Sequence, residues 1–263
     1  MSGYLESYCR SPRELSEIEQ DLSVEVAKET DKSFGMVLLD SPSTDGYFGA
    51  IGRSLEVQRG FGEMPEDMDG LEHTSKFIYT YDYLDGTFRV THSMRYLEPL
   101  AERPLEVVQS LLGDLEGQVT LEEVAEYHAI DNPGLCLYVT TDLSVPGILP
   151  TRSKPYGLLT YKALFERAKE GGFSHVLAYM NSNTIRCMGR LAIHPELLCG
   201  RDNYTIPPVA GLTFEAYQPY VVPTDLPEAR VFDDSEYAAR VSRWGRQILA
   251  LTLPCISVED VTR

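Results

Sequence analysis

The stretch that decides the fold is TDLSVPGILPTRSKPYGLL, residues 141–159. It begins as an apolar strand, passes through a loop broken by proline and glycine, and ends at the start of a helical pattern. Arg152 and Lys154 stand in the loop just before the predicted helix, and Gly157 lies at its start. A helix N-terminus attracts anions through its unpaired N–H groups, Arg and Lys add charged donors, and glycine permits close approach. The stretch therefore predicts an anion-binding turn between a strand and a helix.

The distribution of charge agrees with this placement. The 263 residues carry 23 Lys plus Arg and 40 Asp plus Glu, a net charge of −17 that argues against nonspecific binding to nucleic acid. Residues 98–131 hold nine acids and one arginine, whereas residues 146–190 hold seven Lys or Arg and two acids. The local field of the second region would draw an anionic ligand. A solvated basic face is the alternative.

The bulk composition indicates a folded protein of the cytoplasm. A hydrophobic fraction of 43% with 10% aromatic residues is typical of globular chains. We find no apolar run long enough for a transmembrane segment and no signal-peptide pattern. The five cysteines show no CxxC spacing, which favours free thiols in a reducing compartment over disulfides or a zinc site.

Hydrophobic periodicity predicts one α/β domain over residues 1–263, with an acidic helical insertion at 98–131 and a C-terminal helix at 234–253. Inside the insertion, Thr120 and Glu123 form a capping-box pattern. The apolar face around Leu111 would either wall an acyl-chain tunnel or pack on the core. We expect strands at 34–40, 75–83, 87–97, 135–145, 174–180 and 212–222, and further helices at 14–30, 44–62, 156–172 and 183–193.

The sequence resembles a known superfamily at two places. Residues 142–145 (DLSV) and 152–157 (RSKPYG) resemble the DLxV strand and pyrophosphate loop of the Gcn5-related N-acetyltransferases, with Pro155 at the first glycine. The N-terminal half is similar to acyl-homoserine-lactone synthases and long-chain N-acyl amino acid synthases. Arg53 matches their helix arginine, and residues 95–99 (RYLEP) match their RLLPT-like segment. The resemblance covers about residues 48–195.

This resemblance implies a GNAT-like acyl-CoA N-acyltransferase fold, a mixed central sheet flanked by helices. It implies transfer of an acyl group, which we expect to be fatty, to the amine of a small metabolite or amino acid. The donor would be a coenzyme A thioester or the phosphopantetheine of an acyl carrier protein, with no metal. The acceptor would be held by Arg53 and Arg95. A basic patch of Arg152, Lys154, Lys162, Arg167 and Lys169 would receive an acidic carrier protein. The donor-binding residues implied are Leu143, Ser144, Val145, Arg152, Ser153, Lys154, Tyr156, Gly157 and Leu158.

The implied reaction is attack of a neutral amine on a thioester whose carbonyl is polarised by backbone N–H groups of residues 143–145. A base must take the amine proton, and Asp142, Glu72 and His92 are the candidates. Tyr204 would return a proton to the leaving thiolate.

Each of these assignments has a structural alternative. His92 could be a core histidine, Asp142 could fix the loop, Glu72 could lie in a solvated loop, and Arg95 could form a surface ion pair. Two other functions also remain open. One is a catalytically inactive module that binds an acyl ligand or a protein, and the other is a short-chain, acetyl-CoA-dependent N-acetyltransferase.

Overall fold

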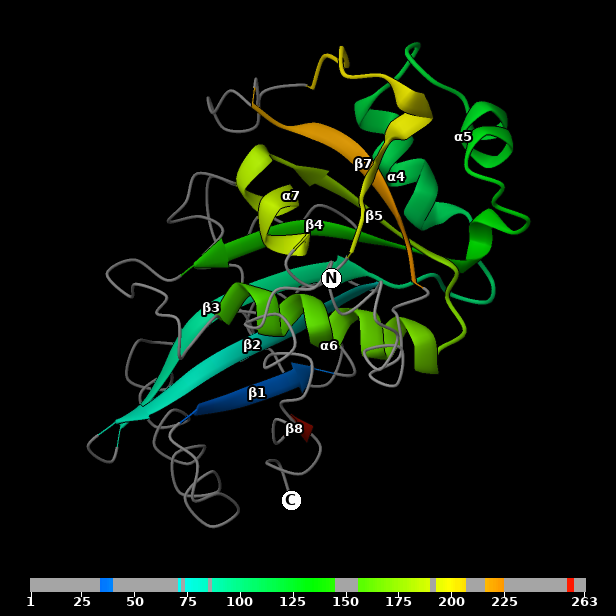
Figure 1. Cartoon of the computed structure of the whole chain (residues 1–263). Helices are drawn as coiled ribbons and strands as arrows, with labels where there is room; N and C mark the ends of the chain where they lie inside the picture. Colours follow the sequence, from blue (N-terminus) through cyan, green and yellow to red (C-terminus); the bar gives the residue numbers. More distant parts are fainter. Residues whose placement is uncertain are drawn as a thin grey trace, which may run out of the picture.

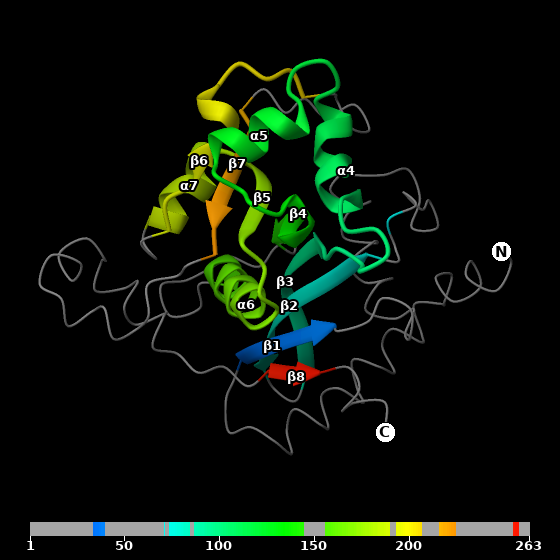
Figure 2. The same cartoon turned by 90° about the vertical axis from the view of Figure 1, so that its right-hand side faces the viewer.

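The computed structural model describes residues 34–39, 71, 74–84, 87–144, 156–189, 193–206, 216–224 and 255–257. The described strands form an eight-stranded mixed sheet in the order β6-β7-β5-β4-β3-β2-β1-β8, with helices on both faces (Figures 1 and 2). The strands are β1 (Phe34–Leu39), β2 (Ser75–Leu84), β3 (Thr87–Leu97), β4 (Cys136–Ser144), β5 (His175–Met180), β6 (Glu196–Leu197), β7 (Gln218–Pro223) and β8 (Cys255–Ser257).

The antiparallel strands β2, β3 and β4 form the middle of the sheet. The predicted hairpin is confirmed, since β2 and β3 pair along their whole length up to Leu84 and Thr87. On β4, Asp142 pairs with Met94 and Ser144 pairs with His92. The register shifts between Arg95 and Tyr96, and this bulge sets which side chains of β3 and β4 share a face.

The parallel pair β4 and β5 separates toward its carboxyl ends. The ladder between them ends at the pair Val139–Ala178, although β4 continues to Ser144. Over the same stretch β5 stays paired with β7, down to Met180 and Gln218. The last residues of β4 therefore diverge from β5 while they remain bonded to β3.

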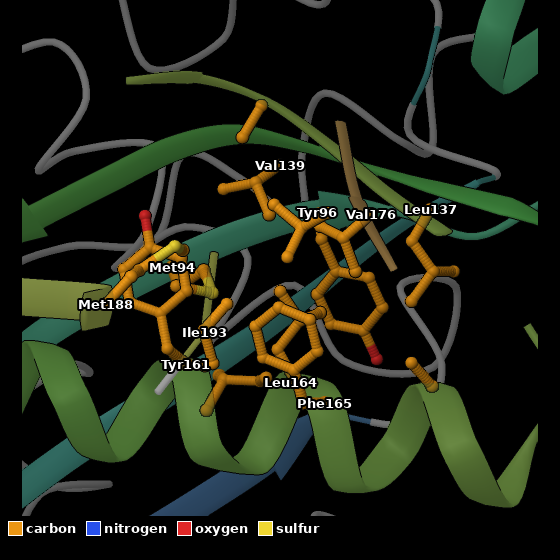
Figure 3. Close-up of a cluster of buried hydrophobic side chains, with 14 of the residues drawn as sticks. Met94, Tyr96, Leu137, Val139, Tyr161, Leu164, Phe165, Val176, Met188 and Ile193 are labelled. Atoms are coloured by element: carbon orange, nitrogen blue, oxygen red, sulfur yellow. The ribbon is translucent and has the colours of Figure 1, made fainter. Parts of the chain in front are cut away.

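Helix α6 (Tyr156–Glu170) connects β4 to β5 and covers one face of the sheet, where α7 (Ser182–Gly189) also packs. Its apolar stripe, including Leu164, Phe165 and Ala168, lies against buried residues of the central strands (Figure 3). The helix ends as its Gly-Gly sequence predicts. Gly172 has φ +70°, and the N–H of Phe173 donates to the carbonyl of Ala168, which is the Schellman pattern.

The opposite face is covered by α4 (Glu106–Asp114) and α5 (Leu121–Tyr127), with the short 3-10 helices η1 (Pro133–Leu135) and η2 (Leu198–Gly200) beside them. The capping box is confirmed, because Thr120 and Glu123 exchange both side-chain-to-backbone hydrogen bonds. Val107, Val108 and Leu111 of α4 are fully buried in the core of this face. Of the two alternatives for the apolar face around Leu111, these contacts fit packing on the core.

The predicted strands agree with β1 to β5 and β7, and the predicted helices 156–172 and 183–193 agree with α6 and α7. The insertion 98–131 contains two short helices, α4 and α5. The two-residue strand β6 and the three-residue strand β8 were not predicted. The predicted helices at 14–30, 44–62 and 234–253 lie outside the described residues.

Candidate functional site

His92 and Asp142 form a hydrogen-bonded pair on the face of the sheet that α6 covers. The antiparallel register places their strands side by side, and the His92 Nε2 atom bonds to the Asp142 Oδ1 atom. Because a carboxylate only accepts, Nε2 carries the proton in this bond. The His92 side chain is 6% exposed and the Asp142 side chain is 25% exposed. The structure therefore brings together two of the three predicted bases, and Asp142 is the one that solvent reaches.

The first turn of α6 lies directly on the His92 ring. A Cβ atom at Gly157 would stand 3.1 Å from the His92 Cε1 atom, closer than most side chains tolerate. The Thr160 hydroxyl donates to the Gly157 carbonyl at 2.8 Å and so stays within the same turn. The sequence predicts that Gly157 lets a bound donor come close to the backbone, and the structure shows the His92 imidazole close to it. Binding of a donor there stays a prediction.

Tyr161, one turn further along α6, lies within the electrostatic influence of the other member of the pair, Asp142. Its side chain is 4% exposed and rises from the helix toward the sheet (Figure 3). Burial, reinforced by the negative charge of Asp142, raises the pKa of the Tyr161 phenol well above its usual range. The phenol is therefore neutral. Sequence periodicity predicts only that Tyr161 lies on the apolar stripe of this helix. The one feature of the sequence that could have marked it as a site residue is its polar hydroxyl among apolar neighbours.

The end of β4 also carries the backbone groups predicted to polarise a thioester. Leu143 and Ser144 pair with β3 on one side, beyond the last β4–β5 pair at Val139. In an antiparallel pair, alternate residues direct their N–H groups away from the partner strand. Here those groups face the region where β5 has diverged. Of the predicted donor-binding residues, Tyr156, Gly157 and Leu158 form the first turn of α6.

Arg95 lies on the opposite face of the sheet from the His92–Asp142 pair. It is 5% exposed, so the surface ion pair considered from the sequence is wrong. Its Nε and Nη2 atoms donate to the Ser75 hydroxyl at 2.9 and 2.7 Å. The described contacts thus tie Arg95 to β2, and a role in binding an acceptor stays a prediction.

Tyr204 also lies on that opposite face, in the core formed with α4 and α5. Its hydroxyl donates to the Leu198 carbonyl at 3.1 Å, and its N–H donates to Gln218. Burial is the main cause that raises the pKa of Tyr204 to about 12. The structure does not bring Tyr204 to the His92–Asp142 pair. The remaining predicted site residues, Arg53, Glu72, Val145, Arg152, Ser153 and Lys154, lie outside the described residues.

Two cations of the predicted basic patch are held in ion pairs. The Lys162 Nζ atom, on a side chain 7% exposed, lies 2.9 Å from Glu166 Oε1. The Arg167 Nε atom lies 3.6 Å from Glu98 Oε2, and Lys76 pairs with the other oxygen of the same carboxylate. Neither Lys162 nor Arg167 therefore presents an unneutralised charge for an acidic carrier protein.

Other reactive groups in the described structure are buried or scattered. Burial raises the pKa of the Cys136 thiol to about 12, as expected of a core thiol. Within the described ranges, three or more His, Cys, Asp or Glu side chains nowhere gather so that they could hold a metal ion. None of the described helices has both the length and the apolar character that crossing a membrane requires.

No protein-family model and no curated protein matches the chain. Solved structures do match it. BjaI, a CoA-dependent acyl-homoserine lactone synthase with SAM and isopentyl-CoA, matches at 10% identity over 88% of this chain and 98% of its own, with a TM-score of 0.53. The CoA-dependent synthase MesI matches at 10% identity over 85% and 99%, with a TM-score of 0.50. At these identities the similarity shows the fold. The chain has the fold of these synthases, which confirms the predicted GNAT-like architecture of a mixed sheet flanked by helices.

Proposed function

We propose that the protein is an N-acyltransferase that moves an acyl group from an acyl thioester to the amine of a small metabolite or amino acid. The observation that carries this proposal is the Asp142–His92 pair. It lies on the part of β4 that diverges from β5 and is packed under the first turn of α6. A base near the end of a strand that β5 no longer pairs, and beside a helix N-terminus, meets the needs of a thioester, its phosphates and an attacking amine.

Coenzyme A is the donor that the observations favour. The fold is shared with synthases described as CoA-dependent. The ion pairs of Lys162 and Arg167 remove two charges from the surface that an acidic carrier protein would need. The N-terminus of α6, together with Arg152 and Lys154 from the sequence, would hold the pyrophosphate.

In the reaction that we infer, the amine nitrogen attacks the thioester carbonyl and Asp142 takes the proton that the nitrogen loses. The carbon–sulfur bond then breaks, and the thiolate leaves with a proton from Asp142 or water. Asp142 is assigned this role because its side chain is 25% exposed, whereas that of His92 is only 6% exposed. His92 holds the carboxylate in place. Backbone N–H groups near Leu143 stabilise the charge on the carbonyl oxygen.

Incubation of the purified protein with acyl-CoA donors of increasing chain length and a pool of amines tests this function. We expect an N-acyl product by mass spectrometry and release of free coenzyme A. Asp142→Asn should lower kcat by about 10²-fold or more, as loss of a general base does. If only acetyl-CoA gave a product, the protein would be a short-chain N-acetyltransferase and not a fatty acyltransferase. Donor binding without transfer from any CoA or carrier-protein thioester would contradict the proposal in favour of a binding module.

A further inference from the structure

We infer that the acceptor of this acyl transfer is an amine with a second, positively charged ammonium group, and that Asp114, Tyr138 and Tyr179 bind this group. These three side chains form the ammonium site. The inference rests on the proposed function, and it names the chemical class of the acceptor, a diamine.

Asp114 supplies the negative charge of the ammonium site. It is the last residue of α4, it is exposed, and its helix packs on the face of the sheet opposite α6 (Figure 2). The Tyr138 hydroxyl, on β4, donates to the Asp114 Oδ2 atom at 3.5 Å, which is long for such a bond. Because a carboxylate offers roughly four lone-pair positions, Asp114 can accept further hydrogen bonds from a ligand.

The second feature is a pair of tyrosine side chains beside this carboxylate. The rings of Tyr138 and of Tyr179, on β5, meet edge to face with their centroids 6.3 Å apart. Burial, followed by the negative charge of Asp114, raises the pKa of Tyr179, so that its phenol is neutral. The Tyr179 hydroxyl oxygen is buried and has no hydrogen-bond partner among the described residues. This oxygen can accept a hydrogen bond from an ammonium group, and the rings attract a cation.

The charges around the ammonium site favour a cation. The C-terminal end of a helix carries partial negative charge, and the last turn of α4 contains no basic residue. Residues 98–131 hold nine acids and one arginine, so their field draws cations toward α4. Arg95 lies on the same face, but its guanidinium donates to Ser75 on β2, on the side of β3 away from β4 and β5.

The ammonium site lies where β4 and β5 separate. Their ladder ends at the pair Val139–Ala178. Tyr138 precedes this pair and Tyr179 follows it, whereas Asp142 is the third residue of β4 beyond it. Asp142 lies on the face that α6 covers, and the ammonium site lies on the face that α4 covers. An acceptor between the diverging strands would present one amine to the base and its second, protonated amine to the ammonium site.

The test compares two acceptors that differ in the second amine, 1,4-diaminobutane and butylamine. In Asp114→Asn we expect the KM for 1,4-diaminobutane to rise about tenfold or more, as for loss of a charge-assisted hydrogen bond, with kcat unchanged. The KM for butylamine should be the same in the variant and the wild type. An equal rise for both amines, or no rise for either, would overturn the inference.

Two further variants separate the ammonium site from the general field of the acidic segment. Tyr179→Phe keeps every charge and should raise the KM for 1,4-diaminobutane about threefold. Glu116→Gln is the matched control, because it removes an exposed acid two residues beyond Asp114. It should keep the wild-type KM. A rise in Glu116→Gln as large as that in Asp114→Asn would overturn the inference.

A titration of the full-length protein with 1,4-diaminobutane, without a donor, tests the ammonium site apart from the reaction. We expect the Kd to rise about tenfold or more in Asp114→Asn. No binding by the wild type, or an equal Kd in the two proteins, would overturn the inference. Binding that depends on Asp114, without acyl transfer to any amine, would contradict the proposed function alone.

Discussion

Gly157 in the first turn of α6 lies against the imidazole of His92 on β3, so near that a Cβ atom would stand 3.1 Å from the ring carbon Cε1. Because His92 bonds to Asp142, any group added at position 157 displaces the candidate base as well. A residue that the sequence assigns to donor binding is thus also a spacer between the helix and the base.

Gly157→Ala should therefore affect activity more than stability. Alanine favours the helix by about 0.5–1 kcal/mol, which offsets the crowding of His92, so we expect the free energy of unfolding to change by less than about 1 kcal/mol. The displaced pair should lower kcat by about fivefold or more.

Acyl transfer and urea unfolding measure the two effects. The control is Gly113→Ala in α4, where nothing lies within 4 Å of the added Cβ atom. It should stabilise the protein slightly and leave kcat unchanged. A Gly157→Ala protein with wild-type kcat would show that the ring has room to move.

The strands and the long helix around this site could be predicted because their signals are local. Alternating apolar residues mark β2 and β3, the Asp85-Gly86 turn signal joins them, and Gly171-Gly172 ends α6 at the place expected. Strand β6 has two residues and pairs with β7, whereas β8 has three residues and pairs with β1 at the other end of the chain. So few residues carry no periodicity from which to infer a strand.

The site could be predicted only in parts. His92 and Asp142 were separate candidates, but their contact depends on the register of β3 against β4 and on the bulge between Arg95 and Tyr96. Periodicity along a strand shows which residues share a face but not which residue of the neighbouring strand lies opposite. Helical periodicity likewise predicts that Tyr161 is buried, but not that the charge of Asp142 lies near enough to affect its pKa.

The partly buried side chain of Glu98 should be important for stability. It is 17% exposed, and its two oxygens lie 3.3 Å from the Lys76 Nζ atom on β2 and 3.6 Å from the Arg167 Nε atom on α6. Glu98→Gln keeps the size but leaves two cations close together. We expect a loss of about 1–3 kcal/mol in the free energy of unfolding, because partly buried charges lose their partner.

Urea unfolding at low and high salt measures this loss. Glu102→Gln is the matched control, since Glu102 is an exposed acid on the same segment. It should change stability by less than about 0.5 kcal/mol. Equal stabilities of the two variants would contradict a structural role for Glu98.

The protein should also lose stability below neutral pH through His128 at the end of α5. Its side chain is 2% exposed, its Nε2 atom accepts the N–H of Cys199 at 3.0 Å, and its Nδ1 atom faces Glu196. Cys199 has φ +48°, so this hydrogen bond holds a backbone conformation that non-glycine residues rarely adopt. Only neutral imidazole can accept that bond.

Burial, which outweighs the attraction of Glu196, lowers the pKa of His128 below its ordinary value of 6.5. The unfolded chain then binds a proton at a pH where the folded chain does not. The stability that His128 contributes is therefore complete above about pH 6.5 and is lost as the pH falls toward its folded pKa. His128→Gln should be less stable than the wild type near pH 8, and the difference should shrink toward pH 5. The exposed His194→Gln variant should follow the wild type throughout. Free energies of unfolding across this range, measured in urea, would contradict the assignment if the His128→Gln and wild-type curves ran parallel.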